Sequence, residues 1–197
     1  MPKTKTTTVV TKKYRRKYRR TKSVSNYFKV ILNVPMIGEY TYGQDNPRFG
    51  MRGDGLDLNT QYTIAVLLQT SPMWQTYQNV FSMFRLRGVA VVVQAVGENQ
   101  RFSGPMTFKL GFVKQGQGYD WRLVSESNYQ LTMPFNGKSR LYLPMISHGV
   151  GWIKTANLIT DQPGQFMMAK WPHDFDGISL AWNIEFKFYI TFKLTIY

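Results

Sequence analysis

The sequence predicts an all-β fold, an eight-stranded antiparallel sandwich with one short helix, preceded by a basic segment outside the folded body. Three observations support this prediction. Residues 182–196 alternate between apolar and polar side chains, seven further β-rich runs are separated by turn signals, and positive charge is concentrated in residues 1–22. With 197 residues, of which 43% are hydrophobic, the chain is long enough for one well-packed domain. We therefore expect a basic arm at 1–22 and a single folded domain at 23–197.

The basic arm is defined here as residues 1–22. It contains ten of the 25 lysines and arginines, and no acidic residue precedes Glu39. A block of like charges repels itself and buries too little apolar surface to offset the loss of chain entropy. We expect the arm to be disordered until a polyanion neutralises it.

The densest part of the arm is KKYRRKYRR at 12–20, which combines cations with two tyrosines. Arginine binds phosphate oxygens with a forked pair of hydrogen bonds, and tyrosine can stack on an unpaired base. This composition predicts sequence-independent binding of nucleic acid, and the same cluster is typical of a nuclear localisation signal. A solvated charge run without a partner is the alternative. The candidate nucleic-acid-binding residues are Lys12, Lys13, Tyr14, Arg15, Arg16, Lys17, Tyr18, Arg19, Arg20 and Lys22.

The expected strands follow at fairly regular spacing. They lie at 27–34, 61–68, 84–96, 106–113, 129–133, 140–143, 166–171 and 182–196. Between them are turn signals such as Gly53-Asp54-Gly55, Asn136-Gly137 and Pro163-Gly164. This arrangement favours an antiparallel sandwich over alternating strands and helices. The connections at 35–60 and 144–165 are long for structureless loops, so we expect them to be binding or contact loops.

The last strand has the clearest pattern. An apolar residue occupies every second position, so one face is predicted to lie on the core and the other to face water or a partner. The apolar set is Trp182, Ile184, Phe186, Phe188, Ile190, Phe192, Leu194 and Ile196.

One helix is predicted after the second strand. Ser71 and Pro72 are a favourable N-cap and first-turn pair, and Trp74, Tyr77 and Phe81 then share one face at helical spacing. We expect that face to cover one end of the sandwich.

The sequence contains no motif typical of an enzyme. It lacks a nucleophile elbow, a phosphate-binding glycine loop and a zinc-protease motif, and its two histidines, His148 and His173, lie in predicted loops. The acidic turns around Asp54 and at 173–176 fit turn chemistry better than metal binding. We therefore expect no catalytic residue, no metal and no cofactor. The chain has no cysteine and no apolar run of membrane-spanning length, so neither disulfides nor membrane insertion are expected.

Three stretches, in order along the chain, resemble a known family. They are YQNVFSMFRLRGVAVVVQAV at 77–96, SRLYLP at 139–144 and WNIEFKFYITFKL at 182–194. Together with the basic arm, they resemble the capsid proteins of circoviruses and related viruses with small circular single-stranded DNA genomes that encode a replication initiator.

The resemblance implies that the sandwich is a viral jelly roll that assembles with copies of itself into a small icosahedral (T=1) shell of sixty. It also implies that the arm lies inside against a single-stranded DNA genome and directs nuclear import. The implied locations are the virion and, during assembly, the host nucleus. The implied partners besides the chain itself and the genome are a nuclear import receptor and a host-cell attachment factor.

Two alternatives use the same features. A coat protein of a small single-stranded RNA or satellite virus would need the same arm and the same jelly roll. A cellular β-domain with a basic nucleic-acid-binding tail is the other alternative. A cupin-like jelly-roll enzyme would need clustered metal-binding histidines, which this sequence does not supply.

Overall fold

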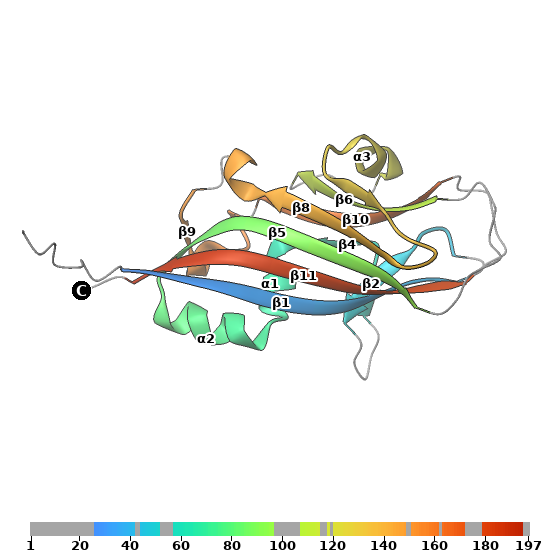
Figure 1. Ribbon diagram of the computed structural model, residues 1–197. Coiled ribbons are helices and arrows are strands. Elements are labelled where there is room, and N and C mark those ends of the chain that lie inside the picture. Colours follow the sequence, from blue (N-terminus) through green and yellow to red (C-terminus); the bar gives the residue numbers. More distant parts are fainter. Residues whose placement is uncertain are drawn as a thin grey trace, which may run out of the picture.

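The computed structural model describes residues 26–41, 44–51, 57–96, 107–114, 118, 120–148, 151–161, 163–171 and 179–194. Their strands form two antiparallel sheets that pack face to face (Figure 1). The basic arm lies outside the described residues, so its predicted disorder is not tested.

The larger sheet has seven strands. In spatial order they are β3 (Asp57–Asn59), β2 (Arg48–Met51), β1 (Tyr27–Tyr40), β11 (Leu180–Lys193), β5 (Met83–Val96) and β8 (Lys138–Pro144), and β9 (Ile153–Lys154) also pairs with β5. The smaller sheet has four strands in the order β4 (Gln61–Thr63), β10 (Gly164–Trp171), β6 (Thr107–Lys114) and β7 (Gln130–Thr132).

The strand pairing is that of a jelly roll. The eight principal strands in chain order are β1, β4, β5, β6, β7, β8, β10 and β11. The first pairs with the last, the second with the seventh, the third with the sixth and the fourth with the fifth. Such nested pairing results when one long antiparallel hairpin is rolled into two sheets, and double-sheet closure of this kind leaves few exposed edges. The predicted fold class is confirmed, and each of the eight predicted runs contributes one of these strands.

Several boundaries differ from the prediction. The run at 61–68 is strand only as far as Thr63, where the side-chain hydroxyl accepts a hydrogen bond from the backbone N–H of Val66 (3.3 Å) and begins helix α1 (Ile64–Gln69). The apolar residues 64, 65, 67 and 68 have helical spacing and are buried, which explains why this segment is helical rather than extended. The predicted loop at 35–60 is also partly wrong, because β1 continues to Tyr40 and β2 and β3 follow.

The predicted helix is α2 (Pro72–Val80), and it packs against the end of the larger sheet. Trp74 is fully buried, and the Phe192 ring lies 5.0 Å from Phe81 and 5.2 Å from Tyr77. The predicted helical face is therefore confirmed. Ser71 is the N-cap residue, but its side chain makes no capping hydrogen bond.

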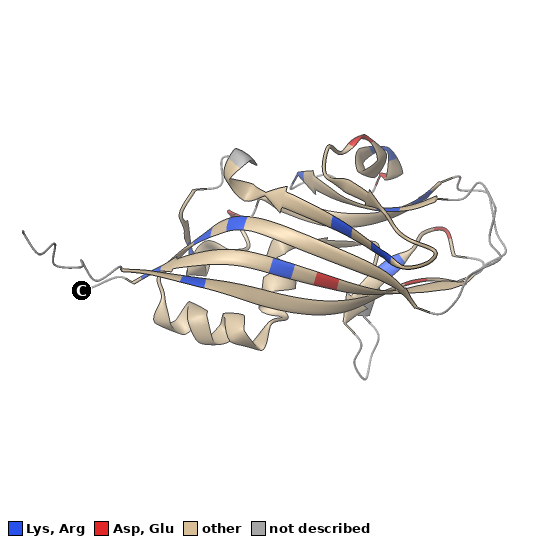
Figure 2. Ribbon diagram, viewed as in Figure 1, with Lys and Arg blue, Asp and Glu red and all other residues tan. Residues whose placement is uncertain are grey.

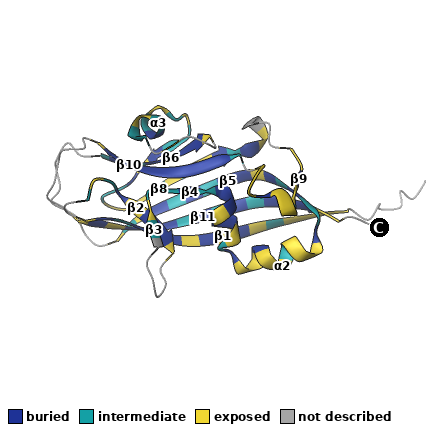
Figure 3. Ribbon diagram, turned by 180° about the vertical axis from the view of Figure 1, so that it is seen from behind, coloured by how far each residue is buried: buried dark blue, intermediate teal, exposed yellow. Residues whose placement is uncertain are grey.

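A third helix, α3 (Trp121–Glu126), was not predicted. Asp120 caps it by accepting a hydrogen bond from the N–H of Arg122 (2.9 Å). It lies over the smaller sheet, on the side away from the larger sheet (Figure 1). Because β10 has the main core on one face and α3 on the other, it is buried along nearly its whole length (Figure 3). The remaining elements are two short 3₁₀ helices, η1 (Met145–His148) and η2 (Thr155–Asn157).

The alternation predicted for the last strand is confirmed as far as Phe192. All six apolar residues from Trp182 to Phe192 are at most 1% exposed. Leu194 does not belong to this set, because it lies beyond the end of β11 and is 46% exposed. Ile196 lies outside the described residues.

Candidate nucleic-acid interface

The ten arm residues predicted to bind nucleic acid all lie outside the described residues. The first described residue is Asn26, whose carbonyl oxygen accepts a hydrogen bond from the N–H of Leu194 (3.0 Å). β1 then begins at Tyr27, opposite Lys193 of β11. The arm is therefore joined to one end of the larger sheet.

The larger sheet has a solvent-facing side that we call the basic face, formed by the outward side chains of β1, β11, β5 and β8. Figure 2 shows Lys and Arg on all four strands. The only acidic residues of these strands are Glu39 and Glu185. The seven cations are Lys29, Arg85, Arg87, Lys138, Arg140, Lys187 and Lys193.

Period-two alternation places these charges on one side of the sheet. Lys187 lies between Phe186 and Phe188, which point into the core, so its side chain points outward. Within β5 and β8, the pairs Arg85 and Arg87, and Lys138 and Arg140, are each two residues apart and therefore share a face. The sequence analysis did not predict the basic face. Its cations come from four segments that lie far apart in the sequence, and in each segment they alternate with uncharged residues, so they form no continuous basic stretch.

The opposite side of the molecule has a different chemistry. The outer face of the smaller sheet carries an apolar patch that α3 covers, with Val113, Val124, Met167 and Ala169 in a second buried cluster. Trp121 of α3 stacks on Trp171 at the end of β10, with the ring centroids 4.2 Å apart. In the described part of the chain, the larger sheet therefore presents an open basic face, whereas α3 covers the apolar part of the smaller sheet.

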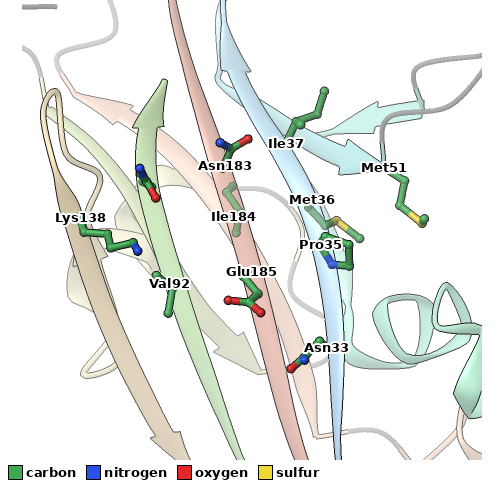
Figure 4. A pocket seen from close by; sticks show the side chains of 11 residues that line it. Asn33, Pro35, Met36, Ile37, Met51, Val92, Lys138, Asn183, Ile184 and Glu185 are labelled. Carbon is green, nitrogen blue, oxygen red and sulfur yellow. The ribbon is translucent and has the colours of Figure 1, made fainter. Parts of the chain in front are cut away.

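The basic face is hollowed rather than flat. One depression of about 490 Å³ is lined in part by apolar side chains, which include Pro35 and Ile37 of β1 and Val92 of β5 (Figure 4). The polar side chains include Asn183, Glu185 and Lys138, which reach it from β11 and β8. A second depression of about 420 Å³ lies further along the sheet, where Tyr142 and Tyr189 form part of its lining.

One ion pair fixes part of this surface. The ammonium nitrogen of Lys187 lies 3.1 Å from a carboxylate oxygen of Glu185, two residues away on the same strand. Both side chains are more than a third exposed, and ion pairs of this kind contribute little to stability. The pair offsets part of the charge of Lys187 and leaves the arginines as the principal cations near it.

Lys170 carries a cation in the interior. Its side chain is 1% exposed, and its ammonium group donates a hydrogen bond to the hydroxyl of Tyr40 (2.9 Å) and lies 4.8 Å from the centre of that ring. It is thus removed from both faces, and it links β10 to β1 across the core.

The structure assembles no metal site from the described residues, where no group of three His, Asp or Glu side chains could hold an ion. Asp54 and residues 173–176 lie outside the described residues, and the side chain of His148 is not described. None of the described helices has the length and apolar character of a membrane span.

No protein-family model matches the chain, and no curated protein matches it in sequence. The chain is similar in structure to viral proteins. A chain of Mud crab tombus-like virus matches with a TM-score of 0.60 and 8% identity, covering 100% of this chain and 94% of that one. A chain of Cocksfoot mottle virus matches with a TM-score of 0.58 and 12% identity, covering 100% and 97%.

The BFDV capsid protein, solved as a decamer, matches with a TM-score of 0.50 and 11% identity over 85% of this chain and 99% of that one. At these identities the likeness shows the fold. The chain therefore has the jelly-roll fold of viral capsid proteins, in agreement with its strand pairing.

Proposed function

We propose that the chain is a viral capsid protein that assembles with copies of itself into a closed shell and packages single-stranded nucleic acid. One observation supports this most strongly. The capsid-type jelly roll leaves one sheet face open and basic, and the basic arm is joined to the end of that same sheet. A cavity-facing sheet and an arm of like charge would act on one polyanion.

The number of cations that the arms would carry into a shell is consistent with packaging of a nucleic-acid genome. In a shell of sixty, the simplest icosahedral number, the arms alone bring about 600 cations to the cavity. Fully extended, an arm of 22 residues reaches at most about 75 Å, which spans much of a small interior. Assembly and packaging would then be coupled, because the genome offsets the repulsion between arms.

We propose single-stranded circular DNA as the genome. The resemblance of three sequence stretches to circovirus capsid proteins supports this choice, and so does the likeness in fold to the BFDV capsid protein. On this proposal, residues 12–22 also act as a nuclear localisation signal read by an import receptor, and assembly takes place in the host nucleus. Attachment to a host cell would then use the loops on the outside of the shell.

A single-stranded RNA genome is the second candidate. It is favoured by the likeness to the Mud crab tombus-like virus chain, which extends over the whole of this chain. Phosphate neutralisation is the same for both polymers, so the chemistry of the arm suits either one.

Purified full-length protein, imaged by negative-stain electron microscopy and then extracted and digested with DNase or RNase, tests this function. We expect closed particles whose nucleic acid is single-stranded and sensitive to DNase. RNA alone in closed particles would replace the DNA assignment with the RNA one. A stable monomer at physiological salt, with or without added nucleic acid, would contradict the capsid function and favour a cellular binding domain.

A further inference from the structure

Two tyrosines meet on the basic face above a glycine. Tyr142 of β8 and Tyr189 of β11 approach edge to face, with their ring centroids 6.0 Å apart. They come from the two strands that flank β5, and Tyr189 lies directly opposite Gly88 of β5. Tyr142 is 56% exposed, so a large aromatic surface faces solvent here.

Gly88 makes this arrangement possible. A Cβ atom at this position would lie 2.4 Å from the hydroxyl oxygen of Tyr142 and 2.8 Å from Cζ. A β-bulge also occurs here, because Arg87 is an extra residue between the pairs Tyr189 with Gly88 and Ile190 with Leu86. The bulge turns both Arg87 and Gly88 toward the basic face, so a cation stands beside the space that the glycine leaves.

The depression next to the tyrosines is suited to a flat ligand with anionic ends. Its lining combines Ala90 and Val92 of β5 with the two rings, and Arg140 lies at its side. On the other side of Tyr189, a further hollow is lined by Arg87 and Lys29. The aromatic pair is thus flanked by arginine on both sides.

We propose that this depression holds one unpaired nucleobase, stacked on the exposed ring of Tyr142 with its edge against Tyr189, and that the neighbouring phosphates lie on Arg87 and Arg140. A nucleotide within a strand has an apolar, π-faced base between two phosphates, which matches the order of groups on this surface. A base inside a duplex has both faces covered by its neighbours and cannot stack there. The site would therefore make the folded domain select single-stranded nucleic acid, independently of the arm.

The depression in Figure 4 extends this site along the sheet. Val92 lines both this depression and the one beside the tyrosines. In the depression of Figure 4, Gln94 of β5 is paired with Asn183 of β11 on one side and with Lys138 of β8 on the other. Two residues along a strand advance about 6.6 Å, so successive rows of side chains could meet successive nucleotides. The amides can bond to base edges, and the lysine to a phosphate.

This inference depends on the proposed function, and photo-crosslinking of the full-length protein tests the two separately. The probes are short single-stranded DNA and RNA oligonucleotides that carry iodouracil, together with the corresponding duplexes. After ultraviolet irradiation, peptide mass spectrometry locates the attached residue. We expect crosslinks at Tyr142 or Tyr189 with single strands, and none there with duplexes.

Substitutions provide the second measurement. Tyr142→Leu combined with Tyr189→Leu should lower single-strand affinity about tenfold while changing duplex affinity less than about twofold, with the salt dependence unchanged. Tyr142→Phe retains the ring and should bind as the unmodified protein does. Trp171→Leu removes an exposed aromatic side chain at the end of β10, in the smaller sheet, and should also bind normally.

The outcomes that overturn the inference are distinct from those that overturn the function. Crosslinks confined to arm peptides, or equal single-strand affinity in the double variant, would refute the tyrosine site and leave the capsid function standing. Absence of nucleic-acid binding by the unmodified protein would refute both. Crosslinks at the tyrosines with both single strands and duplexes would refute the proposed selectivity.

Discussion

At the scale of the residue, successive side chains of β11 point alternately into the core and toward the outer face of the sheet. Phe186 and Phe188 are fully buried, while Lys187 between them reaches solvent. The alternation in the sequence was sufficient to predict these positions, because a strand places successive side chains on opposite faces. It could not predict that Leu194 is exposed, since the end of a strand depends on where its neighbours stop pairing.

Replacing Phe188 with Asp should prevent folding or assembly. The substitution places a carboxylate where the native side chain is fully buried and also leaves a cavity, at a combined cost of several kcal/mol, about the stability of a whole domain. Circular dichroism and the soluble yield measure the effect. Asn183→Asp adds the same charge at an exposed position of the same strand and should remain folded. A folded Phe188→Asp protein that still forms shells would show that the core face is assigned wrongly.

At the scale of the element, strands were predicted better than caps and short helices. All eight principal strands were found because their β-rich runs are bounded by turns, but α1 was taken for strand, since a short apolar run has no unambiguous period. Helix α3 has only six residues and one buried apolar side chain, Val124, which is too little pattern to detect. For the site, the arm could be recognised from its charge density, whereas the basic face needed the register of four strands.

The helix caps differ in a way that can be measured. Asp120 accepts a capping hydrogen bond at α3, but Ser71 makes none at α2. Asp120→Ala should therefore lower the free energy of unfolding by about 0.5–2 kcal/mol, and Ser71→Ala by less than about 0.5 kcal/mol. Urea unfolding of the two variants under identical conditions provides the comparison. A larger loss for Ser71→Ala would mean that the serine hydroxyl is bonded in solution.

At the scale of the whole molecule, the two sides of the sandwich differ in their chemistry. The smaller sheet is covered by α3 over an apolar cluster, while the larger sheet remains open with seven cations on β1, β11, β5 and β8. Overall charge did not reveal this, because acidic residues elsewhere reduce the sum for the body. The wall of a shell has an inner and an outer surface. The placement of the cations on one face of the sandwich suits such a wall, whatever the net charge of the domain.

Deleting residues 1–22 should remove most nucleic-acid retention and leave the domain folded. The ten cations of the arm are lost, and a segment this basic buries too little apolar surface to contribute much to the core. The slope of log affinity against log salt should become much shallower, which fluorescence anisotropy at several salt concentrations measures. Loss of folding on truncation would contradict the separation of arm and domain. Salt dependence equal to that of the full-length protein would contradict the role of the arm.

The orientation of the subunit in an assembled particle tests the central claim most directly. A cryo-electron microscopy reconstruction of particles made from the full-length protein would show which sheet lines the cavity. We predict a closed shell in which β1, β11, β5 and β8 turn their basic face inward onto density from nucleic acid, with α3 toward the outside. A shell with α3 facing the cavity, or no closed particle at all, would contradict the account.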